Sequence, residues 1–110
     1  MNVIKNIDTR VALTNIAESV PLGERVYVKF GATWCGPCKM LSNVISASKL
    51  ECVTIVEVDI DSKFGGELVS EAGVRGVPTM IEINGLGKFT CRVQVGTMKQ
   101  LDLDKFLGGK

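Results

Sequence analysis

The sequence predicts an α/β fold in which a central mixed sheet lies between layers of helices. Segments rich in β-forming residues alternate with segments of helical periodicity, which is typical of parallel strands joined by helices. Residues 25–32, RVYVKFGA, are almost continuously apolar, as in a strand covered on both faces. Near the C-terminus two strand segments flank an Asn-Gly pair, which predicts an antiparallel hairpin.

The composition is that of one ordinary globular domain. We expect a single domain over residues 1–110, because a chain of 110 residues with 45% hydrophobic and 23% charged residues has material for one core. The net charge of +1 gives no electrostatic basis for binding nucleic acid or a membrane surface. No segment approaches the ~18 apolar residues of a membrane span, and the N-terminus lacks a signal-peptide pattern. We therefore expect a location in the reducing cytoplasm.

The first half of the chain predicts two strand–helix units. Residues 3–7 suit a short strand, and Asp8 or Thr9 suits the N-cap of a helix that runs to about Val20. After a break at residues 21–24, the strand of residues 25–32 leads into a helix from Cys35 to about Leu50. The positions expected to face the core on these two helices are Ala12, Leu13, Ile16, Ala17, Val20, Met40, Leu41, Val44, Ile45 and Ala47.

The second half predicts a strand, a helix, a hairpin and a last helix. Residues 52–61 suit a strand, and residues 62–73 suit a weaker helix that Gly65 and Gly66 interrupt and Gly73 closes. The hairpin strands fall at residues 79–83 and 88–96, around NGLG. We expect Thr97 to cap the final amphipathic helix, which completes the order βαβαβαββα. Its expected core residues are Leu101, Leu103, Phe106 and Leu107.

Two cysteines, Cys35 and Cys38, lie at the predicted junction of strand and helix, within WCGPCK. Residues i and i+3 of a helix share a face, with β-carbons about 5–6 Å apart, so a disulfide between them can close and reopen with little backbone movement. At the helix start, Cys35 would lie beside unpaired N–H groups and the positive end of the helix dipole, which favour a thiolate. Pro37 suits the first turn. Cys38, one turn deeper, is expected to be less exposed and suited to resolving a mixed disulfide.

A zinc half-site or a structural disulfide would also use two close cysteines. Zinc needs two further ligands, but the chain has no histidine, and Cys52 and Cys91 stand apart, so we expect no metal. The lack of histidine also means that backbone groups or other charges must stabilise any thiolate. We expect Cys91 to face the core together with Phe89, Val93 and Val95, and Cys52 to be partly exposed.

Three stretches resemble the thioredoxin family, and the resemblance extends over essentially the whole chain. They are FGATWCGPCKML at residues 30–41, GVRGVPT at residues 73–79 and VG at residues 95–96. The resemblance implies a thioredoxin fold in which Cys35 is the attacking nucleophile and Cys38 the resolving thiol. It also implies that Pro78 follows a cis peptide bond and that the Val77 backbone lies against the substrate chain. The implied flat apolar rim for protein partners consists of Trp34, Gly36, Pro37, Val77, Pro78 and Gly96.

The chain departs from the family beside this site. Most thioredoxins have a buried aspartate where this chain has Lys29, and they tend to have a lysine where it has Glu57. We therefore expect Lys29 and Glu57 to form a pair with exchanged charges that tunes Cys38, because an unpaired buried ammonium would cost several kcal/mol. The alternative is that Lys29 extends to solvent and Glu57 is merely an exposed strand residue. Gly31 replaces an aromatic residue of many thioredoxins and leaves less packing above the site.

The implied activity is reduction of protein disulfides by thiol–disulfide exchange through a reversible Cys35–Cys38 bond. We expect a monomer without a bound cofactor, recycled with electrons from NADPH through a flavin-dependent thioredoxin reductase. Two alternatives remain open at this point. One is a thioredoxin-fold binding subunit of a larger complex, and the other is a glutaredoxin-like reductase driven by glutathione.

Overall fold

The computed structural model describes residues 1–108, and it has the predicted α/β class and element order. Residues 109 and 110, which the single-domain prediction includes, lie outside the described residues. The strands are β1 (Asn2–Ile4), β2 (Arg25–Gly31), β3 (Val53–Asp59), β4 (Thr79–Ile83) and β5 (Phe89–Val95). The helices are α1 (Arg10–Ser19), α2 (Gly36–Ala47), α3 (Lys63–Ala72) and α4 (Gln100–Leu107).

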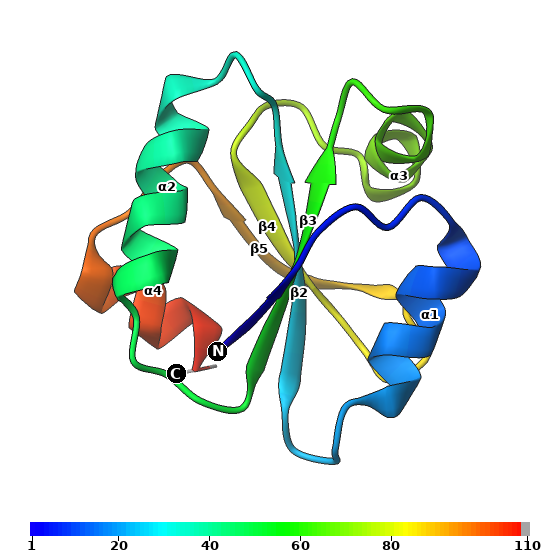
Figure 1. Cartoon of the computed structure of the whole chain (residues 1–110), viewed down its shortest axis with the longest axis horizontal. Helices are drawn as coiled ribbons and strands as arrows, with labels where there is room; N and C mark the ends of the chain where they lie inside the picture. Colours follow the sequence, from blue (N-terminus) through cyan, green and yellow to red (C-terminus); the bar gives the residue numbers. More distant parts are fainter. Residues whose placement is uncertain (109–110) are drawn as a thin grey trace.

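The five strands form one mixed sheet in the order β1-β3-β2-β4-β5. Strands β1, β3 and β2 are parallel, whereas β4 runs antiparallel to both β2 and β5. The central strand β2 is buried over all five of its interior residues, as its apolar sequence predicted. Because β2 and β3 are parallel and Gly31 pairs with Asp59, both strands end at the same edge of the sheet. The first turn of α2 begins just beyond that edge (Figure 1).

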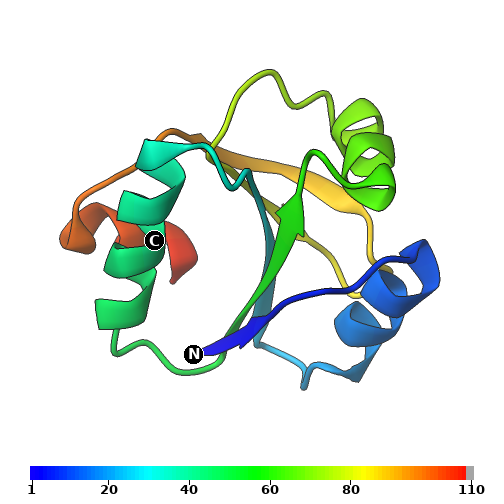
Figure 2. The ribbon, with the colours of Figure 1, turned by 45° about the horizontal axis from the view of Figure 1, so that its top comes forward.

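Two helices cover each face of the sheet (Figures 1 and 2). On one face Leu13 of α1 and Leu68 of α3 pack in a cluster with the even-numbered residues of β2. On the other, Leu41 of α2 and Leu103 of α4 pack against Tyr27 of β2. Side chains of a strand alternate between its faces, so Lys29 lies on the Tyr27 side, beneath α2.

Tyr27 ties the central strand to the last helix. Its hydroxyl donates to the backbone oxygens of Leu107, at 2.8 Å, and Phe106, at 3.0 Å. Burial raises the pKa of this phenol above its usual range, because the ionised form would lose its hydration. The neutral hydroxyl thus anchors α4 beside α2.

Four side chains that were expected to face the core or cap a helix do not do so. Met40 and Leu101 are exposed. Met40 lies about 100° around its helix from the buried Leu41, and Leu101 lies two positions, about 200°, from the buried Leu103. Ala47 is exposed at the last position of α2, which ends before the expected Leu50. The N-cap of α4 is Lys99 instead of Thr97, since the chain first turns at Gly96, where φ is 87°.

Strand β5 follows the predicted phase only at Phe89, which packs on the core, and has the opposite phase from Cys91 on. Cys91, Val93 and Val95 are exposed, so the expectation that Cys91 faces the core is wrong. The half-buried face carries Arg92, whose guanidinium lies 4.9 Å from the Phe106 ring of α4. An edge strand can bury polar side chains beneath a terminal helix, and alternation alone does not reveal which face is covered. Cys52 is exposed, in agreement with the sequence.

The glycines of α3 do not interrupt the helix. A β-carbon at Gly65 would lie 1.8 Å from the backbone oxygen of Asp59, so the missing side chain lets α3 start directly against the end of β3. At Gly66 the nearest atom to such a carbon would be 3.9 Å away, in ordinary contact. Gly73 closes the helix in the left-handed conformation, as predicted.

This contrast predicts opposite effects of two neighbouring substitutions. Gly65→Ala should lower the free energy of unfolding by about 2–3 kcal/mol, because the methyl group displaces backbone at the strand end. Gly66→Ala should leave it unchanged or raise it by up to about 1 kcal/mol through helix propensity. Urea unfolding of both variants measures this, and equal effects would contradict the packing described.

Candidate functional site

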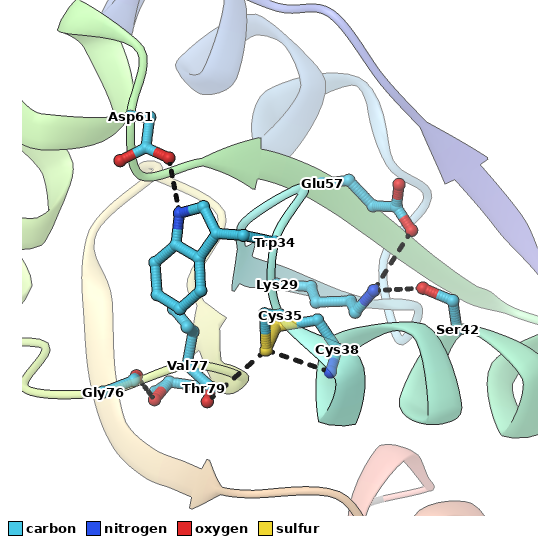
Figure 3. The surroundings of a disulfide bond; sticks show 10 residues. All are labelled: Lys29, Trp34, Cys35, Cys38, Ser42, Glu57, Asp61, Gly76, Val77 and Thr79. Carbon is cyan, nitrogen blue, oxygen red and sulfur yellow. Dashed lines mark hydrogen bonds and ion pairs between the residues drawn. A yellow bond between two sulfur atoms is a disulfide. The ribbon is translucent and has the colours of Figure 1, made fainter.

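Cys35 and Cys38 lie at the start of α2 and form a disulfide, with Cα atoms 5.3 Å apart (Figure 3). Cys35 is the N-cap residue, in extended conformation, and its sulfur accepts a hydrogen bond of 3.1 Å from the backbone N–H of Cys38. Pro37 falls within the first turn. The sequence thus placed both cysteines correctly on the helix. A negative charge on the Cys35 sulfur would meet this N–H and the positive end of a 12-residue helix.

The two cysteines are equally buried in the disulfide form. Each is 4% exposed, so the expectation that Cys38 is the less exposed of the two is wrong. The reason is that the Cys35 sulfur turns inward, toward its partner and toward the backbone oxygen of Val77, 3.8 Å away. The Val77 backbone therefore lies within reach of a group that reacts with the Cys35 sulfur.

The loop before β4 lies against the disulfide. Its Val77–Pro78 peptide bond is cis. The hydroxyl of Thr79 donates to the Gly76 oxygen at 2.6 Å, and the N–H of Gly96 donates to the Pro78 oxygen at 2.8 Å. These bonds fix the Val77 backbone beside Cys35.

The rim residues implied by the resemblance surround the cysteines on the surface, with one exception. Trp34 is 66% exposed, Gly36 and Pro37 are exposed, and Val77 and Gly96 are half-buried. The ring of Pro78 is buried, so this residue shapes the loop from beneath and does not lie on the surface.

Asp61 positions Trp34 and was not identified from the sequence. The indole N–H of Trp34 donates to its carboxylate at 2.8 Å (Figure 3). Asp61 follows β3, and β3 ends at the same sheet edge as β2. The strand register could therefore have predicted that Asp61 lies near Trp34.

Lys29 is buried beneath α2 and has two polar partners. It is 5% exposed, and its ammonium donates to the hydroxyl of Ser42, at 2.5 Å, and to the carboxylate of Glu57, at 3.4 Å (Figure 3). The structure therefore places Lys29 and Glu57 in an ion pair and does not extend Lys29 to solvent. Their β-strands place the two residues directly opposite each other in register.

Two members of this cluster were missed by the sequence reasoning. Ser42 lies four residues after Cys38, on the same face of α2. Lys5 follows β1, where Ile4 pairs with Val56, and its ammonium lies 3.6 Å from the second oxygen of Glu57. Glu57 is thus shared by one buried and one exposed lysine.

A cavity of about 520 Å³ connects this cluster with Cys38. The pocket lies between the N-terminal segment, the ends of β2 and β3, and α2. Gly31 has no side chain, and a β-carbon there would lie 3.6 Å from the Cys38 sulfur. The glycine therefore leaves the space next to this sulfur unfilled. The lining residues, none of which belongs to the rim, are Lys5, Asn6, Ile7, Asp8, Lys29, Gly31, Ala32, Thr33, Cys38, Lys39, Ser42, Glu57, Val58, Asp59 and Ser62.

Within residues 1–108, no three histidine, cysteine, aspartate or glutamate side chains are arranged to hold a metal ion. In the same range, no helix is both long and apolar enough to cross a membrane.

Comparisons with known proteins agree with this geometry. The model of the thioredoxin family matches residues 10–108. A thioredoxin from Chlamydia muridarum is 42% identical over 73 residues, which cover 64% of this chain and 69% of that protein. The bifunctional thioredoxin reductase/thioredoxin of Mycobacterium leprae is 33% identical over 91 residues, 77% of this chain and 19% of that protein. The solved structure of a mutant thioredoxin from Halobacterium salinarum superposes with a TM-score of 0.80 at 25% identity, covering 98% of this chain and 89% of that one.

Proposed function

The chain belongs to the thioredoxin family of dithiol–disulfide oxidoreductases, and we propose that it reduces disulfide bonds in other proteins. The observation that carries this proposal is the Cys35–Cys38 disulfide at a helix N-terminus, with one sulfur hydrogen-bonded by a backbone N–H. A thiolate is the attacking form in thiol–disulfide exchange, and this position favours it without a histidine.

The reaction proceeds in two exchanges. In the reduced protein, the Cys35 thiolate attacks one sulfur of the target disulfide, forming a mixed disulfide and releasing the other target sulfur as a thiolate that takes up a proton. Cys38 then loses its proton and attacks Cys35. This second exchange breaks the mixed bond, forms the Cys35–Cys38 disulfide and releases the second target thiol. Two electrons pass from this chain to the target.

The rim gives a docking surface for the target chain. Trp34, Gly36 and Pro37 present a flat exposed surface beside Cys35, and the Val77 backbone lies next to its sulfur. A target segment that pairs with the Val77 backbone would bring its own disulfide to Cys35.

The oxidised protein must be reduced again after each cycle. We propose that electrons come from NADPH through a flavin-dependent thioredoxin reductase, with no cofactor bound to this chain. The fusion of both activities in the Mycobacterium leprae relative supports this partner. We further propose that the protein acts as a monomer in the cytoplasm, where such a reducing system operates.

Substituting each cysteine by serine separates their roles. Cys35→Ser should reduce protein-disulfide turnover at least about 10³-fold, because the nucleophile is lost. Cys38→Ser should instead accumulate a mixed disulfide at Cys35, visible as a mass adduct that dithiothreitol removes. Insulin reduction coupled to NADPH consumption is the assay, and Cys91→Ser, an exposed cysteine outside the site, is the control.

Two further measurements test the two rival functions. Full biological activity of the double Cys35→Ser/Cys38→Ser variant would indicate a binding subunit. Coupling through glutathione and its reductase, without coupling through thioredoxin reductase, would indicate a glutaredoxin-like protein. We expect neither result.

The buried ammonium of Lys29 is proposed to tune Cys38. Lys29 and Cys38 line the same cavity. The carboxylate of Glu57, on the neighbouring strand β3, partly balances the charge of the Lys29 ammonium. Two unit charges about 6 Å apart interact by about 3 kcal/mol at an effective dielectric constant of about 20, an upper bound that the Glu57 charge lowers. A positive charge stabilises the Cys38 thiolate and thus the reduced protein, which makes the disulfide a stronger oxidant.

Replacing the ammonium by an apolar side chain of similar length tests this role. Lys29→Met should shift the redox potential by about 30 mV to more negative values, a tenfold change in the equilibrium constant. The thiolate fraction of Cys38 at neutral pH should fall as well. Equilibration with a dithiothreitol redox buffer measures the potential, and an unchanged potential would contradict the proposed role of Lys29.

A further inference from the structure

We propose that Ser42 and Lys5 are positioning residues that set the net charge felt by Cys38. Ser42 holds the Lys29 ammonium on the side of α2, and Lys5 draws part of the Glu57 charge away from Lys29. This inference rests on the proposed role of Lys29 in the reaction.

Ser42 binds the ammonium more closely than the carboxylate does. The Lys29 nitrogen lies 2.5 Å from the Ser42 hydroxyl and 3.4 Å from the nearer Glu57 oxygen. Ser42 stands one helical turn after Cys38 on α2, whereas Glu57 stands on β3 (Figure 3). The neutral hydroxyl therefore keeps the positive charge near the helix turn of Cys38, where a carboxylate alone would draw it toward β3.

Glu57 divides its negative charge between two lysines. One oxygen faces Lys29, and the other lies 3.6 Å from Lys5. The Lys5 side chain is 64% exposed, while that of Glu57 is 25% exposed, so Lys5 reaches the carboxylate from solvent. Because Lys5 offsets part of the carboxylate charge, the Lys29 ammonium is less completely cancelled at Cys38.

The cavity transmits this balance to the cysteine. Its charged lining residues are Lys5, Lys29, Lys39, Asp8, Glu57 and Asp59, three of each sign, so the position of each charge matters more than their sum. The lining residues and the rim residues are separate sets, so a target that docks on the rim alone does not cover the pocket lining. The charge balance therefore acts during the second exchange, when Cys38 must lose its proton while Cys35 is bound to the target.

The equilibrium to be measured is exchange with dithiothreitol, a dithiol reductant. Reduced dithiothreitol gives two electrons and two protons to the Cys35–Cys38 disulfide and becomes a cyclic disulfide, while the protein becomes a dithiol. A variant that places less positive charge near Cys38 shifts this equilibrium toward the protein disulfide.

The hydroxyl of Ser42 is tested by a matched set of variants. Ser42→Ala should shift the equilibrium about threefold to tenfold toward the disulfide, because the ammonium then moves to Glu57. Ser42→Thr keeps the hydroxyl and should stay within about twofold of the wild type. Ser46→Ala is the control, since Ser46 lies one turn further along α2, where its hydroxyl donates to the Ser42 backbone oxygen.

Lys5 is tested by removing its charge. Lys5→Gln should shift the equilibrium in the same direction but by only about twofold, because an exposed charge is screened by water and salt. The shift should shrink in high salt. Lys88→Gln, an equal charge change in the hairpin loop, should have no effect.

A double-mutant cycle decides whether Ser42 acts through Lys29. In a Lys29→Met background, Ser42→Ala should cause no further shift, whereas Lys5→Gln should keep its shift, because Lys5 acts on Glu57. Equal shifts in Ser42→Ala and Ser46→Ala, or a full shift of Ser42→Ala in the Lys29→Met background, would overturn the inference. Insulin reduction by the wild type distinguishes failure of this inference from failure of the proposed function. If the wild type does not reduce insulin, the proposed function itself is refuted.

Discussion

The structure depends on one constraint, the burial of all five interior residues of the central strand β2. Its apolar residues supply both faces of the core, and the strand also carries Lys29 within that core. The strand ends at Gly31, and the chain reaches the first turn of α2 only a few residues later. The position of Cys35 as the N-cap, and that of the ammonium beneath α2, both follow from where β2 lies and ends.

Burial of Lys29 explains why polar groups gather around it. A buried ammonium without partners costs several kcal/mol, so the surrounding elements must supply hydrogen-bond acceptors. Glu57 comes from the neighbouring strand at the same register level, and Ser42 comes from the helix above. The contacts that compensate the burial of the ammonium also hold it at a fixed place beneath α2.

Much of the fold could be predicted because the sequence is locally consistent. The continuous apolar run of β2, the N-cap at Thr9, the Asn-Gly hairpin and the αL glycine at Gly73 each correspond to the observed element. The errors fall where tertiary packing decides. The phase of β5 depends on α4 covering one of its faces, and the start of α4 depends on a turn at Gly96.

The candidate site likewise contains residues that local sequence patterns predict and residues that only tertiary packing brings together. The spacing of Cys35 and Cys38 and the pairing of Lys29 with Glu57 follow from helix and strand periodicity, together with the family resemblance. Asp61, Ser42 and Lys5 were not identified, because their contacts with Trp34, Lys29 and Glu57 join separate segments and form only in the folded chain. Polar residues on surface elements give no periodic signal that marks their contacts.

The most direct test is a titration of the Cys38 thiol by NMR in a Cys35→Ser variant, where no neighbouring thiolate repels it. An ordinary free cysteine ionises with a midpoint near pH 8.5, and burial in apolar surroundings raises that value. If the Lys29 ammonium governs the site, the midpoint of Cys38 should be lower in this variant than in the Cys35→Ser/Lys29→Met double variant. Equal midpoints in the two variants would contradict the proposed effect of Lys29 on Cys38.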